Sequence, residues 1–463
     1  MPAPSVRAAF VVGLALVCQT CVASDCGSAD VGCSPSDGSI HDSSHDDARA
    51  DAAPTLADTG HVADGAAVDA TGLGDPGWVH LADVPSDCNY QIATDPTSVT
   101  PGPVAAGPHV PMVDCGAGCR RTEASTYSPN DVFRAGGRTL AVLGYTEDFV
   151  GAVMPVVRTL VDLDGTTVAA VRFRIDFSGT GVNCGTDHFG GNGSDVAFEV
   201  NYARYDATGN HVVDAWIRIY RGPYDGITPT VARLGEHVFV PALGGGELVG
   251  AVRLGPDMAS FNYVGTVFAV EPDGTTFPVS ATLALHASAP FPVASDVLFS
   301  GTTSTSAPFG GVLARSVHGA DATVVRSVSG GDLGVFGSDG TTLAWEEASG
   351  WDSGTGTYAT RSLWSSTYDG DIHPVYVREM NAAGVSTTAV GGGYFVEDED
   401  DAASGHHVYA IYRLSDGARA IFDPVAAGGS APAERVPFVA ADELVFDTTG
   451  MLWRVDPRTL TFF

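Results

Sequence analysis

The segment GVFGSDGTTLAWEE, Gly334 to Glu347, contains the clearest signal for the fold of this chain. Two extended runs flank an Asp-Gly pair, and an Asp-Gly pair in this setting is a strong signal for a β-hairpin. The same turn recurs as LDGTT at Leu163 to Thr167 and as PDGTT at Pro272 to Thr276. A hairpin turn that recurs in this way predicts an all-β fold built from similar units.

The chain from Trp78 onward repeats short extended segments separated by glycine. The composition agrees, because 57 glycines and 27 prolines with many Val and Thr residues favour short strands and tight turns. We expect strands at Thr139 to Tyr145, Thr166 to Phe177, Asp195 to Tyr205, Val212 to Arg221 and Gly265 to Pro272. A second recurrence precedes or closes the units, with DVLFSG at Asp296, DLGVFGSDG at Asp332 and ELVFDTTG at Glu443. These imperfect and irregularly spaced repeats are interpreted as units of roughly 40 to 60 residues, the range of propeller blades.

Residues 334–384 resemble one blade of the exported WD40-like, periplasmic Tol-type β-propeller proteins of bacteria. Ser338, Asp339 and Gly340 match the turn of that blade, a strand ending in an aromatic residue follows, and a later strand leads to Gly384. The segment between the two strands, Ala348 to Ser362, is interpreted as a long polar insert. ELVFDTTGMLWRVDPRTL at residues 443–460 is similar to the closing blade of such proteins.

The resemblance implies a β-propeller of about seven blades, within a range of six to eight, and a tandem β-sandwich is the alternative fold. A propeller removes exposed strand edges by closing its ring. We expect the strand near WVHLADV, Trp78 to Val84, to complete the C-terminal blade and provide this closure.

The first 23 residues have the features of a signal peptide. Arg7 precedes an apolar run, Ala8 to Val17, which is too short to span a bilayer, and cleavage is expected after Ala23. Cys18 and Cys21 follow the apolar run and are the lipidation candidates. The residues before them depart from the lipobox pattern, which has Leu three positions upstream and a small residue next to the cysteine.

Residues 24–76 are predicted to form a disordered, acidic tether. Eleven aspartates and one arginine lie between Asp25 and Asp75, with almost no large apolar residue. Such a composition cannot bury enough surface to offset the entropy of ordering. The chain therefore divides into a signal peptide (1–23), the tether (24–76) and a β-propeller-like domain (77–463).

The overall charge excludes nucleic acid as a partner. The chain has 55 acidic and 23 basic residues, and the resulting field repels phosphate backbones and anionic lipids. A membrane is therefore expected to be reached only through a lipid anchor. All the basic residues are arginines, which excludes mechanisms that need a lysine.

The cysteines point to an exported protein in the periplasm, at the outer surface or outside the cell. Six remain after removal of the signal peptide, and an even number in an exported chain predicts disulfides. The candidates, with pairing left open, are Cys26, Cys33, Cys88, Cys115, Cys119 and Cys184.

No cofactor is expected from the sequence, and calcium is the alternative. Asp162 and Asp164 resemble a truncated calcium loop, although a plain Asp-Gly turn also explains them. Asp195 lies in GGNGSDVAF, a single copy of a calcium-binding nonapeptide whose neighbouring copies are missing.

Two other features of the sequence are candidate ligand sites. The acidic run Glu397 to Asp401 near His406 and His407 could collect a divalent cation, but it is interpreted as a solvated hairpin tip. Trp351, Trp364 and Tyr368 could stack on sugars, but blade cores also need aromatic residues.

No nucleophile elbow (G-x-S-x-G) and no H-E-x-x-H zinc motif occurs in the sequence. The sequence therefore favours a non-catalytic exported or cell-envelope protein that presents a propeller on an acidic stalk and binds or scaffolds a protein or a glycan. The alternative is a propeller-type carbohydrate-active hydrolase or lyase with carboxylates around the central channel.

Overall fold

The computed structural model describes the chain from residue 77 onward, with gaps. The described residues are 77–81, 84, 88–101, 109–122, 129–148, 151–163, 165–176, 181–192, 195–208, 212–223, 230–233, 238–243, 249–253, 266–270, 276–278, 286–293, 296–304, 308, 310–317, 322–338, 341–380, 388–430, 437–448 and 450–463. They belong to one compact unit. The predicted signal peptide and tether lie outside them. Within the described ranges, no helix has the length and apolar character needed to cross a membrane.

The described structure is almost entirely β, and its helices are the short 3-10 turns η2 (Pro96–Ser98) and η3 (Pro457–Thr459). The strands are β1 (Trp78–His80), β2 (Gln91–Ala93), β3 (Met112–Gly116), β4 (Cys119–Thr122), β5 (Pro129–Ala135), β6 (Arg138–Thr146), β7 (Val153–Asp162), β8 (Thr167–Asp176), β9 (Val182–Asn192), β10 (Asp195–Tyr205), β11 (Val212–Pro223), β12 (Thr230–Arg233), β13 (Val238–Leu243), β14 (Val249–Arg253), β15 (Thr266–Val270), β16 (Thr276–Pro278), β17 (His286–Val293), β18 (Asp296–Thr302), β19 (Gly311–Val317), β20 (Thr323–Ser327), β21 (Gly331–Ser338), β22 (Thr342–Asp352), β23 (Thr357–Thr367), β24 (Val375–Met380), β25 (Thr388–Gly391), β26 (Tyr394–Asp401), β27 (His406–Arg413), β28 (Arg419–Phe422), β29 (Phe438–Val439), β30 (Leu444–Thr448) and β31 (Met451–Val455).

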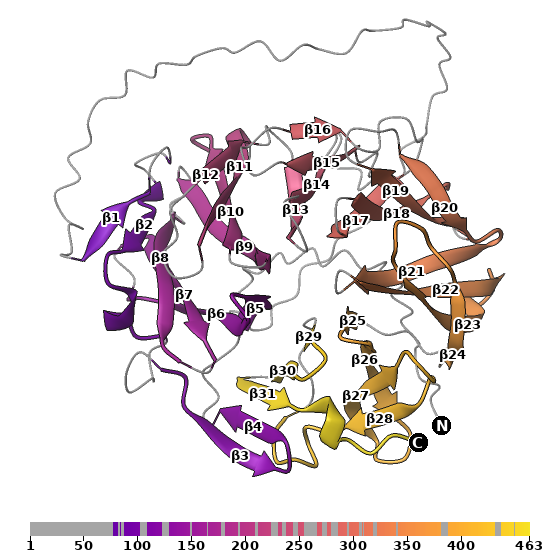
Figure 1. Cartoon of the computed structure of the whole chain (residues 1–463). Coiled ribbons are helices and arrows are strands. Elements are labelled where there is room, and N and C mark those ends of the chain that lie inside the picture. Colours follow the sequence, from indigo (N-terminus) through magenta and orange to yellow (C-terminus); the bar gives the residue numbers. More distant parts are fainter. Residues whose placement is uncertain are drawn as a thin grey trace, which may run out of the picture. The chain divides into compact units, whose positions relative to one another are not determined.

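These strands form the seven blades of a β-propeller, which can be followed by their labels in Figure 1. Blades 3 to 6 are separate four-stranded sheets, β13 to β16, β17 to β20, β21 to β24 and β25 to β28. Blades 1 and 2, β5 to β8 and β9 to β12, join into one sheet through a single residue pair, Ile175 with Asn183. Blade 7 consists of β29, β30, β31 and β4, with β3 added at its edge.

The blades form a closed series. The first strand of each blade contacts the first strand of the next, from β5 through β9, β13, β17, β21 and β25 to β29. Blade 7 then meets blade 1, because Asp442 forms an ion pair with Arg134 at 3.0 Å and Glu443 accepts a hydrogen bond from Thr139. This closure confirms the propeller and excludes the tandem β-sandwich.

The closing strand is β4, and the expectation that Trp78 to Val84 would close the ring was wrong. β4 pairs with β31, whereas β1 pairs with β2, and β2 pairs with the outer strand of blade 1, β8. The segment that contains Trp78 is therefore an extra hairpin on blade 1. Local sequence does not show which of the two short strands closes the ring, because closure depends on long-range strand pairing.

The segment Ala348 to Ser362, interpreted from the sequence as an insert, forms the outer part of a long hairpin. β22 and β23 stay in unbroken register through it, with Ala348 opposite Arg361 and Trp351 opposite Tyr358. The chain turns at Gly356, whose φ of 70° suits glycine and whose N–H donates to the carbonyl of Asp352 at 2.8 Å. Blade 5 therefore extends beyond its core as a two-stranded arm.

The recurring Asp-Gly turns were correctly predicted as hairpins. The copies link β7 to β8, β15 to β16 and β21 to β22, and each flanking pair is antiparallel. The second recurrence mixes two strand positions, because DVLFSG and ELVFDTTG fall at second strands, β18 and β30, and DLGVFGSDG falls at a first strand, β21. It marks apolar strands rather than blade boundaries.

Candidate functional site

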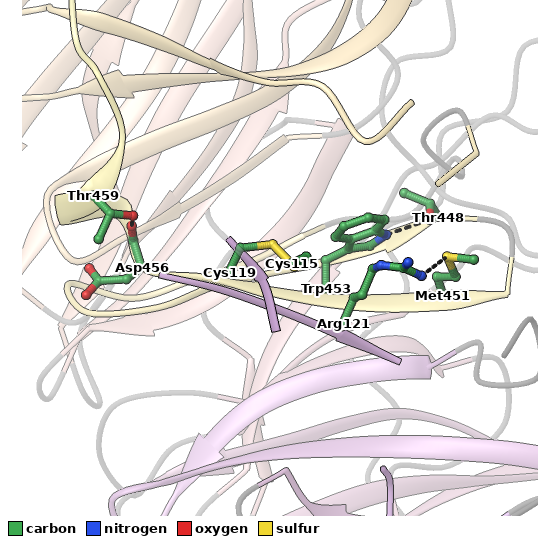
Figure 2. Close-up of a disulfide and its surroundings, with 8 residues drawn as sticks. All are labelled: Cys115, Cys119, Arg121, Thr448, Met451, Trp453, Asp456 and Thr459. Carbon is green, nitrogen blue, oxygen red and sulfur yellow. Dashed lines mark hydrogen bonds between the residues drawn. A yellow bond between two sulfur atoms is a disulfide. The ribbon is translucent and has the colours of Figure 1, made fainter. Parts of the chain in front are cut away.

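The ring closes at the β3–β4 hairpin. A disulfide between Cys115 and Cys119 links the two strands across the hairpin turn (Figure 2). Gly116 and Gly118 have φ values of 136° and 69°, which disfavour other residues at this turn. The hairpin then lays β4 along β31, so that Cys119 lies opposite Val455. The disulfide therefore fixes the shape of the strand that completes blade 7.

Arg121 and Trp453 face each other across this closure. The Arg121 guanidinium lies 5.4 Å from the centre of the Trp453 ring, and one of its N–H groups points at the sulfur of Met451 at 3.6 Å (Figure 2). The indole N–H of Trp453 donates to Thr448 at 2.8 Å. A cation above an indole face is attracted by the ring quadrupole, which strengthens the closure.

A cavity of about 270 Å³ lies beside this closure. Its charged lining residues are Asp114, Arg120, Asp442, Glu443, Arg454 and Asp456. Glu443 accepts hydrogen bonds from both Thr139 and Arg454, and Arg454 also donates to the carbonyl of Leu163 at 3.2 Å. Among these residues, Asp442, Glu443 and Arg454 connect blade 7 to blade 1.

The second described disulfide joins Cys88 to Cys184, across 96 residues of sequence. Both cysteines are fully buried, and the nearby Tyr90 donates its hydroxyl hydrogen to the carbonyl of Gly185. The bond ties the segment before blade 1 to the first strand of blade 2. Cys18, Cys21, Cys26 and Cys33 lie outside the described residues.

The calcium assignment stays a prediction. Asp162 is buried at the end of β7 and forms an ion pair with Arg138. Asp164 and the side chain of Asp195 lie outside the described residues. Asp195 begins the second strand of blade 2, and in blade 4 that position holds Asp296, which accepts a hydrogen bond from Tyr368 of blade 5. Among the residues that are described, no group of three His, Cys, Asp or Glu side chains is arranged to hold a metal.

The acidic run Glu397 to Asp401 is largely inside the protein, and its interpretation as a solvated tip was wrong. It forms the second half of β26, where Glu397, Asp398 and Glu399 are 0%, 1% and 7% exposed. Strand side chains alternate between faces, so the acids divide between the seams with the two neighbouring blades. Nearby cations and hydrogen-bond donors make this burial tolerable.

Glu397 lies in the seam between blades 5 and 6. Its Oε1 accepts a hydrogen bond from Tyr412 at 2.9 Å, and its Oε2 lies 3.6 Å from Arg361 of blade 5. Arg361 is already held by Glu346 through two hydrogen bonds, of 2.6 and 2.5 Å. Burial raises the pKa of Glu397 to about 7, and the attraction of Arg361 and the hydrogen bond from Tyr412 offset only part of this effect.

On the other face of β26, His407 bridges two carboxylates. Its Nε2 lies 2.8 Å from Asp398 and its Nδ1 lies 2.9 Å from Asp400, so the doubly protonated ring can donate to both. Burial opposes the charged ring, but the hydrogen bonds to Asp400 and Asp398 outweigh burial and raise the pKa of His407. Nearby, His406 pairs with Asp423 at 2.7 Å.

The three aromatic candidates for sugar stacking all have protein partners. Trp351 packs against Tyr358 with ring centres 4.9 Å apart, and Trp364 meets Tyr376 edge to face. Tyr368 donates its hydroxyl hydrogen to Asp296, which links blade 5 to blade 4. These contacts favour a role in blade packing.

Sequence reasoning missed Glu346, Arg361 and Tyr412 as partners of the acidic run. One signal was present, since period-2 alternation in WEE places one of two adjacent acids on a buried face. The pairing of that acid with Arg361 depends on strand register, which a single sequence does not reveal.

No family model and no curated protein sequence matches the chain. Among solved structures, the acylaminoacyl peptidase of Pyrococcus horikoshii is similar at 10% identity and a TM-score of 0.43, covering 69% of this chain and 49% of that one. The β-propeller domain of the Trilobed protease from Pyrococcus furiosus has 11% identity and a TM-score of 0.42, covering 74% and 94%. A putative TolB from Agrobacterium tumefaciens has 12% identity and a TM-score of 0.29, covering 52% and 82%. The chain thus spans about half the length of the peptidase.

Proposed function

We propose that this chain is an exported, non-catalytic propeller of the WD40-like Tol-type group that binds or scaffolds a protein or glycan partner. The observation that carries the proposal is the pair of long hairpins, β22–β23 and β26–β27, in adjacent blades. Both join the second and third strands of their blades, so strand alternation places their tips on the same face of the propeller. Loops held on a rigid scaffold are the usual carriers of binding function.

Both hairpin tips are ordered by an aspartate. Asp352 accepts a hydrogen bond from the N–H of Gly354 at 2.8 Å, and Asp401 accepts one from the N–H of Ser404 at 2.8 Å. These bonds, together with those from the Thr355 and Ser404 hydroxyls, lower the pKa values of both carboxyls. An ordered exposed loop loses less entropy when it binds, which favours recognition.

Export is supported by the two disulfides of the described residues, because such bonds persist in oxidising compartments. The proposed signal peptide predicts a mature chain that begins at Ser24. Mass spectrometry of the mature N-terminus tests this directly: a retained residue 1 would contradict export by this route, and a diacylated cysteine would establish the lipid anchor.

A hydrolase, the alternative function, would need a general acid, and the pKa of Glu397, near 7, suits that role. A general acid must come within hydrogen-bond distance of its substrate, and Glu397 is fully buried with its oxygens directed at Tyr412 and Arg361. The geometry therefore favours a structural role for this carboxyl.

Binding at the hairpin face is tested with matched turn variants. Asp352→Ala with Thr355→Ala, and Asp401→Ala with Ser404→Ala, disorder the two tips. Asp416→Ala disorders the β27–β28 turn, which has the same kind of aspartate and glycine but lies on the opposite face. We expect the tip variants to weaken binding to immobilised envelope proteins or glycans of the source cell at least tenfold, and Asp416→Ala to leave it unchanged. Equal binding by all variants, or turnover of a glycan by the wild type, would contradict the proposal.

A further inference from the structure

In the seam between blades 5 and 6, two buried carboxyl groups lie near one buried guanidinium group. Arg361 is 6% exposed, and its guanidinium group donates two hydrogen bonds to Glu346. Glu397 reaches the same guanidinium only at 3.6 Å, and its Oε2 has no hydrogen bond. One guanidinium therefore faces two buried carboxyl groups.

The other groups near Glu397 are either neutral or in contact with other partners. Tyr412 donates a hydrogen bond but is neutral, and burial raises its pKa further. Arg378 lies over the Tyr412 ring at 4.9 Å, and Arg419 is paired with Glu399. The ionisable groups that face Glu397 or its partners are Glu346, Arg361, Arg378, Asp398, Glu399, Tyr412 and Arg419.

We infer that Glu397 holds a proton in the folded protein and that the seam between blades 5 and 6 is a pH-dependent lock. A neutral carboxyl can keep its hydrogen bond to Tyr412 while Arg361 and Glu346 neutralise each other. Loss of the proton leaves a buried negative charge without a full partner, which is strongly unfavourable. The seam then loosens, and this consequence is independent of any binding partner.

The sign of the effect follows from linkage. Burial holds the pKa of Glu397 near 7, above the ordinary value of a glutamate, so the folded chain binds this proton more tightly than the unfolded chain does. The stabilisation is complete in acid, below the ordinary glutamate pKa. It decreases as the pH rises and is lost as the pH passes through about 7.

The test compares Glu397→Gln with the wild type by chemical unfolding between pH 5 and pH 8. Gln keeps the shape and neutrality of the protonated side chain at every pH. We expect the unfolding equilibrium constant of the wild type to increase relative to the variant by up to about tenfold per pH unit until pH 7. Glu147→Gln, which removes the partly exposed partner of Arg172 in blade 1, is the matched control and should show no such trend. A pH-independent ratio between Glu397→Gln and the wild type would overturn the inference.

A second measurement uses the unmodified protein and does not depend on whether the variant folds. Carboxyl resonances of ¹³C-labelled glutamate in the folded wild type should include one that titrates near pH 7. Hydrogen exchange in β22, β23 and β26 should accelerate over the same pH range, while β6 and β7 of blade 1 stay unchanged. Titration of every glutamate in the ordinary acidic range would contradict the lock.

Discussion

Arg361 is the residue on which the seam between blades 5 and 6 depends most. It neutralises Glu346, lies near Glu397 and is almost completely buried. Removing one partner of a buried pair leaves the other charge without compensation, and this usually costs far more than the pair contributes over an apolar replacement. Breaking this buried ion pair should therefore cost more stability than breaking an exposed ion pair of the same chain.

Arg361→Met should lower the free energy of unfolding by about 3 to 5 kcal/mol at pH 7, because it leaves the buried Glu346 without its cation. Arg413→Met, which breaks a largely exposed pair with Asp416, should lower it far less, because solvent screens exposed ion pairs. Chemical denaturation at constant pH measures both. Equal losses for the two variants would show that Arg361 is not the buried cation described here.

His407 predicts a second pH effect, of the same sign. Its pKa is raised in the folded state, so the stability that it contributes is fully present below the ordinary histidine pKa and is lost as the pH rises through the folded value. His407→Gln should therefore destabilise the protein more at pH 5.5 than at pH 9. His373→Gln, at an exposed pair with Asp369, serves as the control. A larger loss at pH 9 would contradict the bridging role of His407.

Individual turns and strands could be predicted from the sequence where local patterns determine them. The Asp-Gly turns and the alternating strands at β6, β8, β10, β11 and β15 were predictable because turn chemistry and side-chain alternation are local. The arm of blade 5 and the burial of β26 were not, because both depend on which strand lies alongside. From sequence alone, a polar or acidic segment is predicted to be exposed to solvent, because the strands that cover it are not known.

The two disulfides should differ in what they contribute. By the loop-entropy argument, the bond between Cys115 and Cys119 closes a very short loop and should contribute about 2 kcal/mol, whereas the bond between Cys88 and Cys184 should contribute nearer about 5 kcal/mol. Paired Cys→Ser variants measured by chemical denaturation test this order. Loss of the smaller bond should also accelerate hydrogen exchange in β4 and β31 and leave blades 4 and 5 unaffected. The reverse order of stability would contradict the assigned roles.

For the whole molecule, the family resemblance predicted about seven blades, but the sequence did not predict how the ring closes. Trp78 to Val84 had the apolar character expected of a closing strand, while β4 consists of CRRT and has no alternating apolar pattern. β4 nevertheless closes the ring, because the disulfide constrains its hairpin and because Arg121 packs on Trp453. Closure thus depends on contacts between residues more than 300 positions apart, which only the folded chain brings together.

A cross-linking experiment tests whether β4 closes the ring. Arg120 and Arg454 lie opposite each other in the β4–β31 register, at a separation that suits a disulfide. Arg120→Cys combined with Arg454→Cys should form a bond between positions 120 and 454 in the oxidised protein, identified by mass spectrometry of its peptides. The combination Val79→Cys with Arg454→Cys should not cross-link. A bond between positions 79 and 454, with none between 120 and 454, would contradict this account of the ring.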